Sequence, residues 1–112
     1  MKMRRGDHKT FTIIRKDKNK NVIMAKPKKM YITYKYGDEN NAVFQKTLNN
    51  GIVFDENTGV YTVKIFPEDT NKLPFGKLKY DIEIIKDNDE VKTIEVGMLE
   101  ILEEVTYAIN EV

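Results

Sequence analysis

The chain has 112 residues, with 19 Lys and Arg, 18 Asp and Glu, and no cysteine. This length suits one domain with a modest core, and the lack of cysteine excludes disulfides and thiolate metal sites. No apolar run reaches the roughly 18 residues of a membrane-spanning helix, and no apolar segment follows the basic N-terminus as in a signal peptide. We therefore expect no membrane partner and synthesis in the cytoplasm.

The net charge of +1 conceals an asymmetry between the two parts of the chain. Residues 1–35 hold twelve Lys and Arg against two Asp, a net charge of +10, and residues 36–112 hold seven Lys against sixteen Asp and Glu, a net charge of −9. Three explanations remain open: neighbouring strands that neutralise each other, attraction between subunits, and nucleic-acid binding by the basic part. We favour the first and disfavour nucleic acid as a partner.

The N-terminal third predicts short strands separated by polar turns. Residues 1–7 are expected to be a lead-in, and His8 an exposed residue at a strand start. Strands are predicted over residues 9–14, 22–25 and 30–36, with a turn over 17–21. In the third strand, Met30, Ile32, Tyr34 and Tyr36 share one face, because side chains alternate along a strand.

The middle of the chain continues this pattern. A turn is predicted over residues 37–41, a strand over 42–48 and an apolar run over 52–54, and the Asn50-Gly51 pair between the last two favours a short hairpin. Residues 60–66 alternate as a strand. Residues 67–73 begin with proline followed by acidic residues, which predicts one helical turn.

The most informative stretch is a corner that leads into a strictly alternating strand over residues 77–86. Leu73 anchors the corner, and Gly76 allows a sharp change of direction. Tyr80 stands near the strand start, where a tyrosine corner would place a buried ring whose hydroxyl binds upstream backbone. The alternative is an ordinary core tyrosine. The stretch predicts structure and carries no catalytic residue.

The C-terminal part predicts a strand from residue 91 to about 102, followed by a linker or a short helix over 103–112. The hydrophobic phase changes beside Gly97, which predicts a bulge or bend there. The last residues also show a heptad spacing, typical of an oligomerisation stem, at Met98, Leu102, Val105, Ile109 and Val112. Residues 1–102 are thus predicted to form an all-β, antiparallel β-sandwich of about seven strands.

Candidate functional residues are few. One candidate binding surface combines aromatic and basic side chains, as glycan or single-strand binding sites do, namely Tyr31, Tyr34, Tyr36, Lys28 and Lys29. The simpler interpretation places part of this set in the core. Asp87, Asp89 and Glu90 resemble a calcium loop, although turns favour such residues for their own reasons. No motif for a catalytic site, a metal or a cofactor is found.

An ordered series of strand and turn residues spans nearly the whole chain. The series comprises Arg5-Gly-Asp-His-Lys-Thr-Phe-Thr12, Met30-Tyr-Ile-Thr-Tyr34, Gln45-Lys46, Asn50-Gly-Ile52, Asp55, Gly59-Val-Tyr-Thr-Val-Lys-Ile65, Glu68-Asp-Thr70, Leu73, Gly76, Tyr80-Asp-Ile82, Val96-Gly97 and Val105-Thr106. This series resembles the N-terminal immunoglobulin-like domain of phage baseplate upper proteins, from tailed phages and prophages of Gram-positive bacteria. The chain departs from the family where a Gly-x-Pro turn and Asp-Leu-Thr-Gly are usual, at residues 19–22 and 26–29.

The resemblance implies a non-enzymatic structural domain of the tail baseplate, which links peripheral, receptor-binding parts to the tail. It implies other tail or baseplate proteins and further copies of the chain as partners, and a final location in the virion tail. It transfers no catalytic residue. The alternative from the residues themselves is a carbohydrate- or cell-surface-binding β-sandwich.

Overall fold

The computed structural model describes residues 1–37 and 42–103. The turn predicted over residues 37–41 therefore lies largely outside this part, as does the linker or helix predicted after residue 103. The predicted all-β fold is confirmed. The elements of the described residues are β1 (Lys2–Arg4), β2 (Lys9–Ile14), β3 (Lys29–Tyr36), β4 (Phe44–Leu48), β5 (Gly51–Phe54), β6 (Val60–Ile65), α1 (Pro67–Thr70), β7 (Gly76–Ile85) and β8 (Val91–Leu102).

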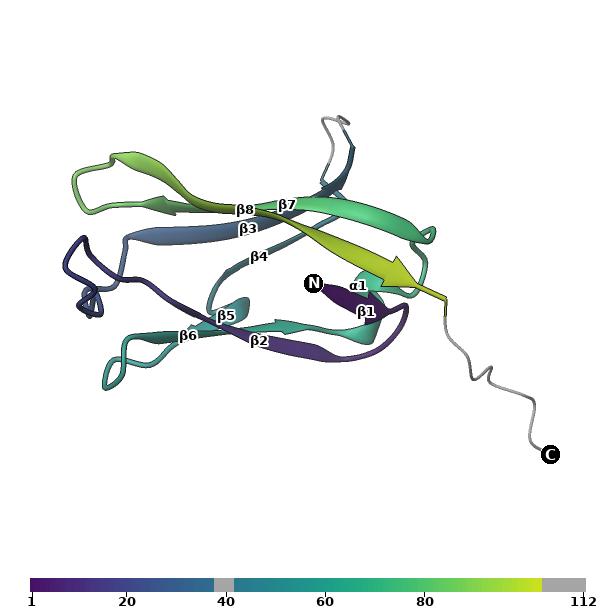
Figure 1. The fold of residues 1–112 in the computed structure, drawn as a ribbon, viewed down its shortest axis with the longest axis horizontal. Helices are drawn as coiled ribbons and strands as arrows, with labels where there is room; N and C mark the ends of the chain where they lie inside the picture. The colour runs from purple at the N-terminus through teal and green to yellow at the C-terminus, as the bar shows by residue number, and fades with distance from the viewer. Residues whose placement is uncertain (38–41, 104–112) are drawn as a thin grey trace.

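The strands of the described residues form one eight-stranded sheet in the order β1-β8-β7-β3-β4-β5-β6-β2. This sheet folds over itself into two facing layers, with β3, β7 and β8 in one layer and β2, β5 and β6 in the other (Figure 1). β4 crosses between the layers, and α1 lies at one end of them (Figure 1). The two outermost strands, β1 and β2, do not pair with each other. The sheet is consequently a nearly closed barrel with an unjoined side.

The link between the layers differs from the predicted hairpin at Asn50-Gly51. β4 and β5 pair in parallel, through Thr47 with Gly51 and Leu48 with Ile52. Asn49 has φ 66° and Gly51 has φ 99°, both in the left-handed region that the corner requires. The hairpin prediction is wrong because the chain bends from one layer into the other here and does not reverse beside itself.

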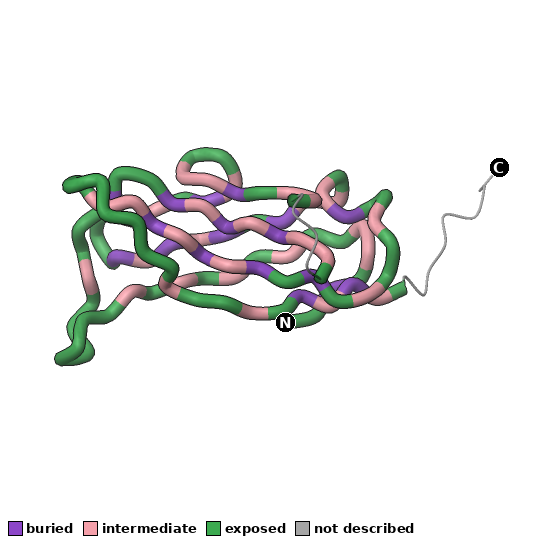
Figure 2. The backbone as a smooth tube through the Cα atoms, turned by 90° about the horizontal axis from the view of Figure 1, so that it is seen from above, coloured by how far each residue is buried: buried purple, intermediate pink, exposed green. Residues whose placement is uncertain are grey.

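The core lies between the two layers and follows the predicted alternation. Buried segments alternate with less buried ones along the strands (Figure 2). The neighbouring strands β3 and β7 contribute cross-strand pairs to the core, among them Ile32 with Ile82 and Tyr34 with Tyr80. Each large apolar side chain buried in this way stabilises the fold by roughly 1.5–3 kcal/mol. The fully buried large side chains are Met30, Ile32, Tyr34, Ile52, Tyr61, Val63, Ile65, Leu78, Ile82, Ile84, Leu99 and Ile101.

Two N-terminal predictions need correction. The expected lead-in contains a strand, β1, which pairs in parallel with β8 through Met3 and Ile101. Burial of Met3 against the core explains why this short segment forms a strand. Conversely, the strand predicted over residues 22–25 is reduced to one bridge between Lys16 and Val22.

β8 carries its irregularity earlier than Gly97. Ile82 pairs with Glu95 and Glu83 with Thr93, so Ile94 is the additional residue of a bulge. Gly97 itself lies opposite Tyr80, where a Cβ atom would come within 2.5 Å of Cζ of the tyrosine ring. The glycine thus makes room for an aromatic ring.

The heptad interpretation of the C-terminal part also fails at its start. Met98 lies within β8, which ends at Leu102. Met98 and Leu102 therefore belong to a strand and cannot be the first positions of a helical heptad. Val105, Ile109 and Val112, the remaining positions of the heptad, lie outside the described residues.

The chain turns at Gly76 before β7, as expected, but the hydrogen bonds at this corner are not the predicted ones. Gly76 has φ 131°, and Leu73 packs against the core. The Tyr80 hydroxyl donates to the Glu95 carboxylate at 3.1 Å and does not reach upstream backbone, so the tyrosine-corner prediction is wrong. Tyr36 is the residue that fastens the corner, since its hydroxyl donates to the Pro74 carbonyl.

Candidate functional site

The predicted binding surface does not exist as one surface. Tyr34 is fully buried and stacks on Phe44 with ring centroids 4.2 Å apart. Tyr36 is held at the corner by its hydroxyl. Tyr31 lies on the outer side of β3, because neighbouring residues of a strand point to opposite faces. The alternation of β3 thus separates Tyr31 from Tyr34 and Tyr36.

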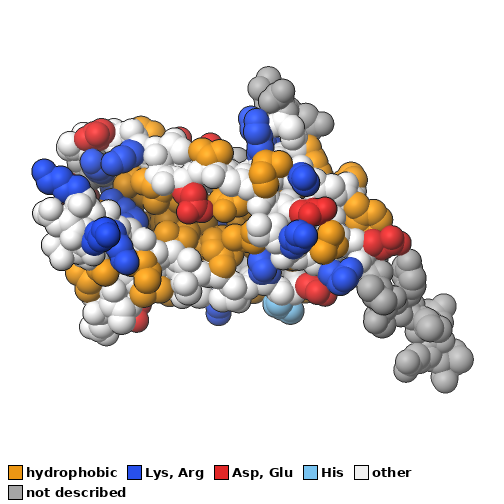
Figure 3. All heavy atoms as spheres, viewed as in Figure 1, with side chains coloured by type: hydrophobic (Ala, Val, Ile, Leu, Met, Phe, Trp, Pro, Cys, Tyr) orange, Lys and Arg blue, Asp and Glu red, His pale blue; other side chains and the backbone are white. Residues whose placement is uncertain are grey.

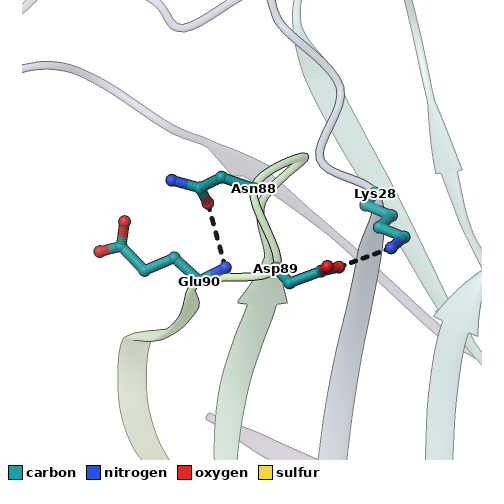
Figure 4. A network of polar contacts seen from close by, with 4 residues as sticks. All are labelled: Lys28, Asn88, Asp89 and Glu90. Atoms are coloured by element: carbon teal, nitrogen blue, oxygen red, sulfur yellow. Dashed lines mark hydrogen bonds and ion pairs between the residues drawn. The ribbon is translucent and has the colours of Figure 1, made fainter.

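The two lysines of that surface, Lys28 and Lys29, lie at the start of β3 and are exposed. Lys28 Nζ lies 2.5 Å from Asp89 Oδ1 in the β7–β8 turn, and the two side chains point toward each other (Figure 4). This pair joins the basic N-terminal part of the chain to the acidic remainder. The Asn88 side chain accepts from the Glu90 amide at 3.0 Å, an ordinary turn bond (Figure 4). The predicted alternative of a turn therefore accounts for the acidic residues here.

The part of the chain that covers residues 1–37 and 42–103 holds no group of three or more His, Cys, Asp or Glu side chains placed to bind a metal ion. It also has no helix of the length and apolarity needed to cross a membrane.

The outer face of the β3–β7–β8 layer contains a shallow hollow of about 570 Å³. Tyr31 lines it beside polar side chains of neighbouring strands, including Gln45 of β4, and Asp81 and Glu83 of β7. One flat aromatic ring surrounded by hydrogen-bonding groups is an arrangement that can receive a polar ring such as a sugar. Of the predicted surface residues, only Tyr31 lines this hollow.

The second candidate is the unjoined side of the barrel, where β2 and β8 are the facing edges. β2 pairs only with β6, and β8 pairs with β1 only through residues 100–102. β2 and the first part of β8 therefore present backbone groups with no strand partner among the described residues. We call the gap between these two edges the seam.

The seam contains a groove of about 300 Å³. Apolar side chains from three segments line it, namely Ile13 of β2, Ile94 of β8 and Ile23 of the β2–β3 loop, and Ile14 on its border is 48% exposed. A space-filling view shows a hollow with hydrophobic walls between the two layers, with basic side chains toward one end (Figure 3). Several branched apolar side chains that remain partly exposed at one place are typical of a protein-binding surface.

The charges around the groove are mainly positive. Arg15, Lys16 and Lys92 line it, and none of them forms an ion pair with another described residue. The acid that lines it, Glu95, accepts a hydrogen bond from Tyr80. Burial, and then the nearby Glu95 carboxylate, raise the pKa of the Tyr80 hydroxyl, so this phenol remains a hydrogen-bond donor at neutral pH.

The end of the barrel near α1 is closed by a buried ion pair. Lys46 Nζ of β4 lies 2.5 Å from Asp69 Oδ2 of α1, with side-chain exposures of 7% and 17%. The same carboxylate accepts from the Phe66 amide at 2.7 Å, which caps the start of the helix. Asp69 thus fixes α1 against β4 at this end of the barrel.

Sequence reasoning did not identify the seam. The consecutive Ile13 and Ile14 were its only local signal, since a half-buried strand should place one of two adjacent residues in water. Ile23 and Ile94 lie far from them in the chain and reach the groove only through the fold. Pairing of strand edges cannot be read from composition.

No protein-family model matches the chain, and a comparison with curated proteins found no similar sequence. The candidate sites therefore rest on the geometry described above.

Proposed function

We propose that this protein is an assembly domain that binds an extended segment of another protein chain along the seam. We further propose that it serves in a phage or prophage tail baseplate, where it links peripheral, receptor-binding parts to the tail. The first proposal is supported by two strand edges beside an apolar groove. The second is supported by the resemblance of its strand and turn residues to baseplate upper proteins.

The physical basis is the addition of a strand to an incomplete sheet. A bound segment would satisfy backbone groups of an unpaired edge, and its alternate side chains would fill the groove. Burial of Ile13 and Ile94 beneath such a segment would add hydrophobic stabilisation at about 25 cal/mol per Å² of apolar surface removed from water. Main-chain hydrogen bonds would contribute affinity, and the groove would contribute selectivity.

A substitution at the border of the groove tests this proposal. Ile14→Asp places a charge beside the apolar wall at a position already 48% exposed, so folding should be retained. Val53→Asp is the matched control, because Val53 is 56% exposed on β5 and does not line the groove. Purified wild type and both variants would be titrated with purified tail proteins encoded by neighbouring genes. We expect Ile14→Asp to weaken complex formation at least tenfold and Val53→Asp to leave it unchanged.

The proposal fails if the wild type is a monomer that binds no tail protein, or if both variants bind as well as the wild type. Circular dichroism of the two variants distinguishes lost binding from lost folding.

A second candidate function is favoured by the hollow around Tyr31. A glycan could stack on this ring and accept or donate hydrogen bonds at Gln45, Asp81 and Glu83. A glycan array followed by titration of Tyr31→Ala tests this function. Saturable binding that the substitution abolishes would support it, and an array without hits would exclude it.

A further inference from the structure

Resting on the proposed function, we infer that the segment bound in the seam is residues 104–112 of a second copy of this chain. Four observations lead to this inference: the regularity of the β2 edge, the charge of the groove, the sequence of residues 104–112, and the position of β1.

The first observation identifies β2 as the strand that accepts a partner. β2 pairs with β6 without interruption over all six of its residues, so its free edge is regular. β8 carries the bulge at Ile94 beside the groove, and bulges are a common means of preventing edge pairing. A donor strand therefore adds to β2, with its inward side chains beneath β8 and next to Ile13.

The second observation is electrostatic. Arg15, Lys16 and Lys92 line the groove without an ion-pair partner among the described residues. A donor segment with acidic residues near its ends would neutralise them, whereas a basic segment would be repelled. The occupant is thus expected to be apolar at alternate positions and acidic at its ends.

The third observation is that the chain itself contains such a segment. Residues 104–112 read Glu-Val-Thr-Tyr-Ala-Ile-Asn-Glu-Val, with two acids and no Lys or Arg. Val105, Tyr107 and Ile109 alternate with smaller or polar residues, and β-branched and aromatic residues favour strands. Placed in the seam, this alternate set faces the groove, while Thr106, Ala108 and Asn110 face water.

The fourth observation indicates that the donor belongs to another copy. β1 occupies the edge of β8 at residues 100–102, immediately before the segment begins. The groove lies at Lys92–Glu95, seven or more residues back along β8, which is about 23 Å at 3.3 Å per residue. A nine-residue segment spans at most about 30 Å, so within one copy it would have to pass β1, reverse, and bring only its last residues to the groove. Between copies the whole segment can lie in the seam.

The resulting interface is heterologous, because the C-terminal segment of one copy meets the seam of the next. Such contacts produce rings when the rotation closes and filaments when it does not. We therefore expect oligomers larger than a symmetric dimer at high concentration.

Substitutions on the two faces of the segment test the inference in the full chain. Ile109→Asp puts a charge on the face that enters the groove, and Asn110→Asp puts the same charge on the face that meets water. Sedimentation equilibrium should show self-association at least tenfold weaker for Ile109→Asp and within about twofold of wild type for Asn110→Asp, as expected from burial of an unpaired charge. Equal effects of the two substitutions would overturn the inference.

A mixing experiment identifies the pairing. One variant reverses charges of the groove (Arg15→Glu, Lys92→Glu), and the other is Ile109→Asp, which disrupts the segment and leaves the groove intact. Each should be monomeric alone, and the mixture should form only a 1:1 complex, since it contains one intact groove and one intact segment. Continued self-association of the segment variant, or no complex in the mixture, would overturn the inference.

The outcome separates this inference from the proposed function. If the wild type stays monomeric but binds another tail protein in a manner lost in Ile14→Asp, the inference is wrong and the proposed function stands. If neither self-association nor such binding occurs, both are wrong.

Discussion

Two ion pairs of the structure, one buried and one exposed, make a matched test of burial. Lys46–Asp69 and Lys28–Asp89 both have an N–O separation of 2.5 Å, but their side-chain exposures are 7% and 17% in the first pair and 49% and 73% in the second. Breaking a buried pair by removing one partner costs about 3–5 kcal/mol, whereas an exposed pair contributes less than about 1 kcal/mol.

Asparagine is the substitution that isolates the charge. In Asp69→Asn the side-chain oxygen still accepts from the Phe66 amide, so the helix cap is retained while Lys46 loses its counter-charge. We expect the free energy of unfolding to fall by about 3 kcal/mol, the lower end of the range for buried pairs, because the flexible lysine stem can carry the ammonium group partway to water. At about 4 °C per kcal/mol for a chain of this size, the melting temperature should fall by roughly 12 °C.

Urea unfolding followed by circular dichroism measures the free energy of unfolding of Asp69→Asn and of Asp89→Asn, which breaks the exposed pair. Asp89→Asn should shift stability by less than about 1 kcal/mol, and Lys46→Met combined with Asp69→Asn should recover most of the loss, because the double variant buries no unpaired charge. Equal losses for Asp69→Asn and Asp89→Asn would refute the reasoning that burial decides the value of the pair.

Two further predictions concern the aromatic interior. Gly97→Ala should destabilise by about 1–3 kcal/mol through overpacking, because its Cβ would lie 2.5 Å from the Tyr80 ring; the same change in a Tyr80→Ala background should cost little by urea unfolding. Burial, and then the charges nearby, raise the pKa of the Tyr34 hydroxyl well above its usual value of about 10. The unfolded chain therefore loses the Tyr34 proton before the folded chain does as pH rises above about 10. The contribution of this residue to the free energy of unfolding is thus fully present below that pH and declines above it. Tyr34→Phe should make the alkaline decline shallower in urea midpoints, and an unchanged decline would contradict this assignment.

Local chemistry explains why most strands could be predicted. Alternation along β3 and β7 identified the buried face correctly. Side chains alternate with a fixed period of two along a strand, and apolar side chains collect on the one face that is removed from water. Pro67 with the acids that follow it likewise predicted the helical turn. These signals are contained within a few consecutive residues.

Predictions failed where a distant segment decided the outcome. Met3 forms a strand because β8 offers it an edge, and Tyr80 bonds Glu95 because the pairing of β7 with β8 brings these two side chains together. The candidate surface of Tyr31, Tyr34 and Tyr36 failed for a local reason, since the alternation that the sequence itself contains places Tyr34 in the core.

The sequence by itself thus determined an all-β chain, the buried face of its longest strands and the positions of most turns. Only the tertiary structure decided that the sheet folds into a barrel left open between β2 and β8, and that isoleucines and cations from separate segments meet there. The physical reason is that side-chain period is a property of consecutive residues, whereas an unpaired strand edge is defined by which segments of the whole chain fail to cover it.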